Sequence, residues 1–270
     1  MQIRMTPAFK DLFDAAQRSI VGMFLCAGDA GVAEICAGAG LDYVLIDGEH
    51  GPSGLETILA QLRAVAGYPC VPVVRVPTND PVIIKQVLDL GAQSLIVPMV
   101  NTADQARDAV AAIRYAPRGI SGVGASLARS ARWNRIPDYL QNAENGLTLL
   151  VQLEAAEAVE NAGEIARVDG IDGVFIGPAD LAATLGLLGQ QDHPDVVAAV
   201  LRCIREVKEA GKIVGVNAFV EQQARVYQDA GADFINVGAD VSLLARGSEA
   251  LAAQYIKNPD ATAFLPNPSY

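Results

Sequence analysis

Two strand-like stretches, LTLLVQLE at residues 147–154 and DGVFIGPADL at residues 172–181, decide the fold of this 270-residue chain. Each is an apolar run that leads into a carboxylate: Glu154 follows the first run, and Asp180 opens a helix just past the second. The order strand, helix, strand, helix predicts that the two strands are parallel. Both carboxylates are therefore expected on one rim, beyond the C-terminal ends of their strands.

This acidic pair has two interpretations. Carboxylates brought together without a basic partner repel unless a cation lies between them, which indicates a divalent metal site. Alternatively, each carboxylate only caps a following helix, because acidic residues are favoured in first turns. The chain has two histidines, His50 and His193, too few for a three-histidine zinc site. Any metal is thus held mainly by oxygen atoms, which favours Mg²⁺ or Mn²⁺.

Eight β-rich runs alternate with helical segments and predict a (β/α)8 TIM barrel, for which the length is typical. The runs cover residues 20–25, 43–46, 71–76, 94–97, 147–153, 172–176, 212–216 and 234–237. Hydrophobic content is 51% and aromatic content 6%, which suits a parallel sheet buried on both faces. We expect one domain over residues 1–257, with a C-terminal helix at 239–256 that packs on a neighbouring subunit. An extended tail is expected over 258–270.

Composition also excludes several classes. The net charge of −11 argues against nucleic acid and against an anionic membrane surface. No apolar run reaches the ~18 residues of a membrane span, and the first ten residues lack a signal-peptide core, so we expect a cytoplasmic protein. No lysine is placed for a Schiff base: Lys212 begins a strand, and the other four lie in predicted helices or the tails. No nucleotide cofactor is expected.

Polar residues follow the second and third strands. Asp47, Glu49 and His50 form a dense cluster after the second strand, and His50 suits proton transfer near neutral pH. The alternative is a histidine tied to a loop carbonyl. Arg75 ends the third strand, and a buried arginine needs anionic partners. In one interpretation, Asp47 or Glu154 alone is the anionic partner of Arg75. In the other, which we favour, the partner is the enolate or carboxylate of a substrate.

The fifth and sixth strands complete the set. The fifth delivers Gln152, and the sixth leads into the turn Gly177-Pro178 and a helix that starts at Ala179 and Asp180. Free backbone N–H groups at a helix start can receive a carboxylate or phosphate. A metal, an arginine, a helix start and a histidine around one cavity fit chemistry through the enolate of a 2-keto acid.

Residues 115–145 break the repeat, because they are too long for a simple helix-to-strand connection. The segment is rich in glycine and, counting Arg114 just before it, carries the arginines Arg114, Arg118, Arg129, Arg132 and Arg135. Such a stretch suits anion binding. Its place between a helix and the next strand lies on the non-catalytic side, however, which favours a structural or subunit-contact role.

Several motifs resemble the HpcH/HpaI aldolase family. They are LIDGEH (45–50), KQVLD (85–89), VPMV (97–100), GVG (122–124), VQLE (151–154) and GVFIGPADL (173–181). The likeness extends over residues 8–256 and is strongest to aldolases of 4-hydroxy-2-oxoheptane-1,7-dioate and of 2-keto-3-deoxy-sugar acids. It implies a barrel of the phosphoenolpyruvate/pyruvate type and a class II, metal-dependent aldolase that uses pyruvate.

The resemblance implies roles for single residues. Glu154 and Asp180 are the implied ligands of a divalent Mg²⁺, Mn²⁺ or Co²⁺ ion. Gln152 and the backbone at Ala179 and Asp180, after Gly177-Pro178, are implied to hold pyruvate.

The catalytic roles implied by the same resemblance fall on Arg75, His50 and Asp89. Arg75 stabilises the enolate and His50 accepts the proton, and we count Asp47 of the polar cluster as a further catalytic candidate. Asp89 raises the basicity of the histidine, yet the predicted topology puts it late in a helix, away from the mouth. A neighbouring subunit is therefore expected to supply Asp89, since the family usually forms hexamers, trimers of dimers with an exchanged C-terminal helix.

Two positions depart from the family pattern. The seventh strand ends in Asn217 where members carry an aliphatic residue, and Phe24 stands where some have tryptophan. Both are expected to line the aldehyde side of the pocket. We expect retro-aldol cleavage of 4-hydroxy-2-keto acids to pyruvate and an aldehyde, with oxaloacetate decarboxylation as a side activity. Alternatives are a lyase or mutase for a phosphoenolpyruvate-like or CoA-ester substrate, and a non-catalytic assembly protein.

Overall fold

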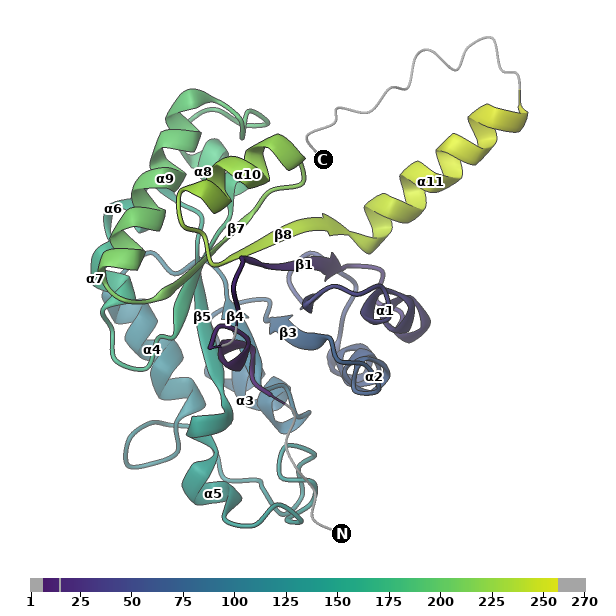
Figure 1. The fold of residues 1–270 in the computed structure, drawn as a ribbon. Coiled ribbons are helices and arrows are strands. Elements are labelled where there is room, and N and C mark those ends of the chain that lie inside the picture. Colours follow the sequence, from purple (N-terminus) through teal and green to yellow (C-terminus); the bar gives the residue numbers. More distant parts are fainter. Residues whose placement is uncertain (1–6, 15, 257–270) are drawn as a thin grey trace.

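Eight parallel strands close into one barrel in the order β1 to β8. Figure 1 shows strands at the centre of the molecule, with helices outside them. The computed structural model describes residues 7–14 and 16–256. The strands are β1 (Ile20–Leu25), β2 (Tyr43–Asp47), β3 (Val71–Arg75), β4 (Ser94–Val97), β5 (Thr148–Leu153), β6 (Gly173–Ile176), β7 (Ile213–Asn217) and β8 (Phe234–Ala239). The predicted (β/α)8 fold is confirmed, and β8, expected at 234–237, extends to Ala239.

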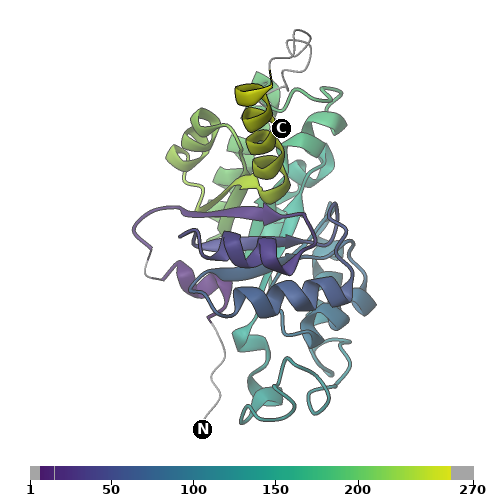
Figure 2. The same cartoon turned by 90° about the vertical axis from the view of Figure 1, so that its right-hand side faces the viewer.

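Helices surround the barrel, as the turned view in Figure 2 shows. They are α1 (Ala30–Ala37), α2 (Leu55–Val65), α3 (Pro81–Asp89), α4 (Ala103–Ile113), α5 (Tyr139–Asn142), α6 (Ala156–Glu160), α7 (Ala162–Ala166), α8 (Pro178–Thr184), α9 (Pro194–Glu209), α10 (Glu221–Asp229) and α11 (Asp240–Tyr255), with 3-10 turns η1 (Phe9–Leu12) and η2 (Glu144–Gly146). Local signals set their ends: the Asp80 carboxylate accepts the Val82 and Ile83 N–H groups at the start of α3. The Thr102 side chain caps α4.

Side chains alternate along each strand between the barrel interior and the helix layer. The interior cluster includes Ile20, Phe24, Tyr43, Leu45, Val71, Val73, Ile96, Leu150, Phe175 and Phe234. Continuing the same alternation past Leu45, Val73 and Leu150 gives polar residues. These residues are Asp47, Arg75 and Gln152. The apolar interior therefore ends in a polar ring at the C-terminal ends of the strands, where (β/α)8 enzymes place their active sites.

The opposite end of the barrel is filled by aromatic rings. Phe9 of η1 is fully buried, with its ring centroid 5.0 Å from that of Tyr43 and 5.1 Å from that of Phe234. Its N–H donates to Ser94 Oγ at 2.9 Å. A Cβ at Gly215 would lie 2.2 Å from the Phe234 ring, so a glycine is required there. This packing seals the N-terminal end of the barrel.

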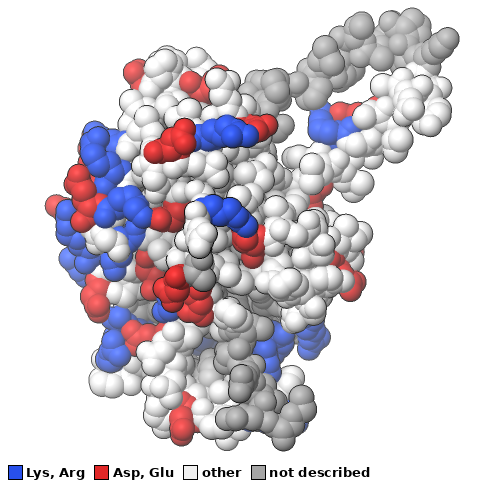
Figure 3. Space-filling view, viewed as in Figure 1, with Lys and Arg blue, Asp and Glu red and all other residues white. Residues whose placement is uncertain are grey.

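Helix α11 projects away from the barrel (Figures 1 and 2), which confirms the helix expected at 239–256. Figure 3 shows it uncharged over most of its length, and Leu243, Leu244 and Tyr255 are 64%, 66% and 77% exposed. The tail expected over 258–270 lies outside the described residues. Within the described part of the chain, no helix combines the length and apolar character that crossing a membrane requires.

Candidate active site

A buried ion pair lies at the centre of the polar ring. Asp47 and Arg75 are register partners on β2 and β3. Arg75 donates from Nε to Asp47 Oδ1 at 2.9 Å and from Nη2 to Oδ2 at 2.7 Å. Burial disfavours the carboxylate, but the hydrogen bonds and charge of Arg75 prevail and lower the pKa of Asp47. The guanidinium also lies 4.9 Å from the ring centroid of Phe24.

The remaining face of Arg75 meets two further groups. Its Nη1 donates to Gln152 Oε1 at 3.3 Å. The same nitrogen lies 2.8 Å from Glu49 Oε2, without the alignment of a hydrogen bond. Burial raises the pKa of Glu49, and the charges of Asp47 and Asp180 add to the effect. The predicted cluster therefore includes Glu49 as a direct partner of Arg75, a role that the sequence did not assign.

Glu154 is held by two donors, and among the described residues it has no ion pair with a basic side chain. Its Oε1 accepts the Met99 N–H at 2.7 Å, and its Oε2 accepts a hydrogen bond from Gln152 Nε2. Burial, followed by the charges of Glu49 and Asp180, raises the pKa of Glu154 to about 7. The carboxylates thus crowd one another, as the metal interpretation requires.

The helix-capping alternative fails for Glu154, which precedes α6 without capping it, whereas Asp180 does lie in the first turn of α8, as that alternative expects. The residue before α6 is Ala155 and the residue before α8 is Gly177, and neither helix receives a side-chain cap. Asp180 is exposed in the first turn of α8, and among the described residues its carboxylate has no hydrogen bond or ion pair. A Cβ at Gly177 would lie 3.2 Å from Glu154 Cβ and 3.3 Å from Glu154 Oε2, so glycine keeps this edge of the carboxylate uncovered.

The donor set fits a hard cation bound through few protein ligands. Within the described ranges, no group of three or more His, Cys, Asp or Glu side chains is arranged to hold a metal ion. Mg²⁺ commonly takes one or two carboxylates and fills its other positions with water or substrate oxygens. Glu154 and Asp180 supply two such oxygen donors. The residues therefore fit a Mg²⁺-type ion with open positions.

His50 and Asp89 are not brought together within the chain. The His50 side chain is 67% exposed, with Nε2 3.9 Å from Glu49 Oε2. In the described part of the chain its imidazole makes no hydrogen bond to a loop carbonyl. Asp89 ends α3 at the opposite end of the barrel, where burial raises its pKa against the charge of Lys85.

The two positions predicted for the aldehyde side are linked through Phe219, whose ring lies 6.4 Å from that of Phe24 and which lines a hollow with Asn217. Phe24 lies beneath Arg75, with its ring also 6.4 Å from that of Phe175. Asn217 ends β7, and its buried Oδ1 has no hydrogen-bond partner. With Ala179 and Phe219 it lines a small hollow of about 40 Å³. Of the two, Asn217 is therefore the one with an unsatisfied polar atom beside the first turn of α8.

Sequence reasoning missed two contributors. Met99 has a left-handed backbone, with φ 55°. The VPMV motif contains no glycine or asparagine at this position that would indicate such a conformation. Asp240 follows β8 and accepts the Cys26 N–H at 2.8 Å and the Ala27 N–H at 3.0 Å. Its position one residue past a strand, like that of Glu154, was the available signal.

Comparison with known proteins agrees with this geometry. The family model for HpcH/HpaI aldolase/citrate lyase matches residues 20–247. A relative from Salmonella arizonae named 4-hydroxy-2-oxo-heptane-1,7-dioate aldolase is 54% identical over 93% of this chain and 95% of its own length. A solved HpcH/HpaI family protein from Burkholderia cenocepacia has a TM-score of 0.86 at 39% identity, over 92% of this chain and 98% of that one. The citrate synthase SbnG has a TM-score of 0.81 at 27% identity, over 92% and 96%.

The barrel, its acidic mouth and these relatives define the class of protein as a carbon–carbon lyase, an aldolase. The chain belongs to the HpcH/HpaI aldolase/citrate lyase family. The predicted resemblance is thereby confirmed.

Proposed function

We propose that this protein is a class II pyruvate aldolase that cleaves 4-hydroxy-2-keto acids. The observation that carries the proposal is Glu154, a buried carboxylate crowded by Glu49 and Asp180 beside the buried cation Arg75. Family members generally depend on a divalent metal. Glu154 and Asp180 would hold that ion, and when bound it would supply Lewis-acid polarisation of the keto group.

The chain's own residues divide the remaining work. Gln152 and the first turn of α8 at Ala179 and Asp180 orient the keto acid, with backbone N–H groups toward its carboxylate. Cleavage removes the proton of the C4 hydroxyl and breaks the C3–C4 bond. The aldehyde leaves, and the bonding electrons pass to the C2 oxygen as an enolate. Arg75 faces this oxyanion and stabilises it.

Proton movement is assigned to His50. Its exposed imidazole receives the hydroxyl proton and exchanges it with solvent, and protonation of the enolate at C3 then gives pyruvate. Asp89 of a neighbouring subunit would approach His50 in a hexamer, a trimer of dimers. Two features support the assembly: Asp89 lies far from the mouth of its own barrel, and α11 exposes a row of apolar side chains.

Asn217 is proposed to line the part of the site that binds the aldehyde. Its unpaired amide oxygen beside Ala179 suits a hydrogen-bond donor on the aldehyde, such as a hydroxyl group. Oxaloacetate decarboxylation passes through the same enolate and is proposed as a side activity.

A cleavage assay that couples pyruvate release to lactate dehydrogenase tests the proposal. We expect activity on 4-hydroxy-2-oxoheptane-1,7-dioate, its loss with EDTA, and its recovery with Mg²⁺, Mn²⁺ or Co²⁺. Borohydride with pyruvate should leave the enzyme active and its mass unchanged. Covalent trapping of pyruvate would contradict the proposal, and turnover of CoA esters or phosphoenolpyruvate in the same screen would favour the alternative.

A further inference from the structure

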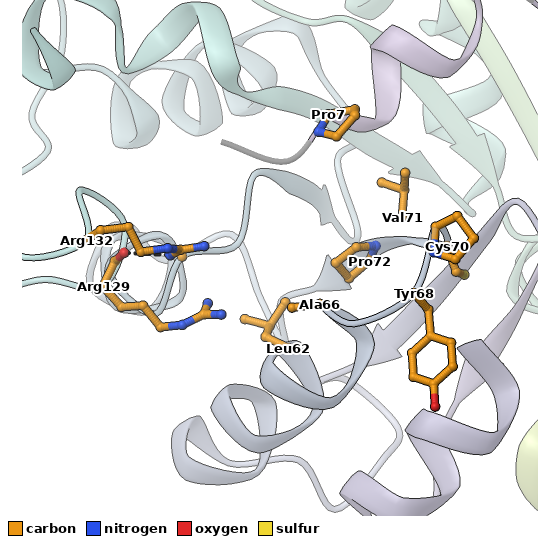
Figure 4. A pocket seen from close by; sticks show the side chains of 11 residues that line it. Pro7, Leu62, Ala66, Tyr68, Cys70, Val71, Pro72, Arg129 and Arg132 are labelled. Atoms are coloured by element: carbon orange, nitrogen blue, oxygen red, sulfur yellow. Dashed lines mark hydrogen bonds between the residues drawn. The ribbon is translucent and has the colours of Figure 1, made fainter. Parts of the chain in front are cut away.

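A second cavity lies at the end of the barrel away from the catalytic mouth. It has a volume of about 280 Å³ and is lined by residues at the start of β3 and the end of α2. Leu62, Ala66 and Pro72 form an apolar side. Arg129 and Arg132 reach in from the 115–145 segment, and Figure 4 shows both guanidinium groups extending toward that apolar side.

The two guanidinium groups converge on one point. A Cβ at Gly91 would lie 2.8 Å from Arg129 Nη1 and 3.2 Å from Arg132 Nη1. Gly91 has φ +91°, in the region that favours glycine, and the missing side chain leaves room for both groups. Arg129 Nη1 donates to the Leu90 carbonyl at 2.8 Å. Arg132 Nη1 donates to the Arg129 carbonyl at 2.7 Å. Both side chains are therefore fixed by backbone oxygens.

Within the described ranges, neither arginine is neutralised by an acid. Elsewhere in this region, Arg114 and Arg118 both pair with Glu144. In the described residues, Arg129 and Arg132 have no carboxylate within ion-pair distance. Burial, then the charges of Arg132 and Arg63, lowers the pKa of Arg129 to about 10. A half-buried cation among like charges requires an anion, because burial without a partner is costly.

We propose that this cavity binds a small dianionic oxyanion with a short apolar body, such as a phosphate monoester. Two guanidinium forks match the charge and oxygen geometry of such a group. Leu62, Val71 and Pro72 would contact the apolar body. The volume lies at the lower limit of small-molecule pockets, which favours a small ligand over an inserted protein segment. The site is separate from the mouth of its own barrel. Asp89, which the proposed assembly brings to the mouth of a neighbouring subunit, lies two residues before Gly91.

Calorimetric titration of the intact protein with phenyl phosphate and with inorganic phosphate tests the site. Arg132→Gln and Arg129→Gln should each weaken phenyl phosphate binding about 10- to 100-fold. Arg135→Gln is the matched control, because Arg135 lies over the Trp133 ring and does not line the cavity. Any anion binding at the mouth persists equally in all three variants, so only the difference between them reports on the cavity.

A second pair of variants keeps the test decisive if an arginine variant fails to fold. Ala66→Glu places a carboxylate on the wall of the cavity, and Ala66→Gln is its neutral control. We expect Ala66→Glu to lose phenyl phosphate binding and Ala66→Gln to retain it within about twofold. Unchanged binding in Ala66→Glu or in both arginine variants overturns the proposal. So does a loss of assembly mass in the arginine variants by sedimentation, which would assign the arginines to an acidic group of a neighbouring copy.

Discussion

The catalytic mouth and the arginine cavity carry opposite charges: acidic side chains gather at the mouth and basic side chains in the cavity. At the mouth, Asp47, Glu49 and Glu154 act on the buried guanidinium of Arg75, and the charge of Asp180 acts on Glu49 and Glu154. In the cavity, arginines gather with no acid paired to them in the described residues. Both regions bring like charges together in partly dry surroundings, where they repel more strongly than in water. Under the two proposals above, each region takes a counter-ion of the opposite sign, a cation at the mouth and an anion in the cavity.

The largest effect is expected when Arg75, the buried cation of the mouth, is removed. Arg75→Ala leaves Asp47 and Glu49 without their buried partner and removes the group that faces the oxyanion. We expect kcat to fall about 10³-fold for aldol cleavage and for oxaloacetate decarboxylation alike. Steady-state rates on both substrates measure this, with circular dichroism as the check on folding. If decarboxylation continues at full rate, the two reactions do not share one enolate.

Removing one acid from the mouth tests its need for a cation. Glu154→Gln keeps the size of the side chain and an acceptor for the Met99 N–H but loses the charge. We expect Mn²⁺ affinity to fall by more than about 100-fold, since loss of an outer partner of a metal ligand already costs about 10- to 100-fold. Calorimetry in the presence of pyruvate measures it. Glu160→Gln, on the exposed side of α6, should bind Mn²⁺ normally.

The mouth was predictable from the sequence because strand ends are visible there. Alternating apolar runs fixed where each strand stops, and parallel topology then placed Glu154, Asp180 and Arg75 on one rim. The arginine cavity could not be predicted from the sequence, because it depends on the 115–145 segment, in which no periodic pattern indicates the path of the chain. Arg129 and Arg132 meet only because Gly91 and Leu90, from another part of the chain, stand beside them. The partners of α11 depend on a second copy, which one sequence cannot place.

A smaller effect is expected from titration of the metal-free mouth. The pKa of Glu154 is raised from about 4.5 to about 7 in the folded protein. Between pH 4.5 and pH 7, the folded state therefore keeps a proton on this carboxyl group that the unfolded chain has lost. The contribution of Glu154 to the free energy of unfolding is therefore largest below its unfolded pKa, and it should fall by roughly 2 to 3 kcal/mol as the pH rises from 5 to 8. Glu49 acts in the same direction, whereas Asp47 acts only below this window.

Urea unfolding at pH 5 and pH 8 in EDTA measures this loss. Glu154→Gln cannot titrate at this position, so its pH dependence should be flatter. Saturating Mg²⁺ favours the ionised carboxylate and should remove or reverse the trend. A metal-free protein that gains stability from pH 5 to pH 8 would show that the crowding of acids at the mouth is already balanced within the chain.

The smallest effect concerns how the mouth holds its carboxylate. Glu154 depends on a backbone donor at Met99, just as Arg129 depends on a backbone acceptor at Leu90. Met99 is 64% exposed and has φ 55°, so its backbone matters more than its side chain. Met99→Gly should leave kcat within about twofold, while Met99→Ile should lose about 1 to 2 kcal/mol of stability, because a β-branched residue resists this conformation. Urea unfolding and steady-state rates compare the two. Equal stability of both variants would mean that the left-handed backbone does not position the N–H that Glu154 accepts.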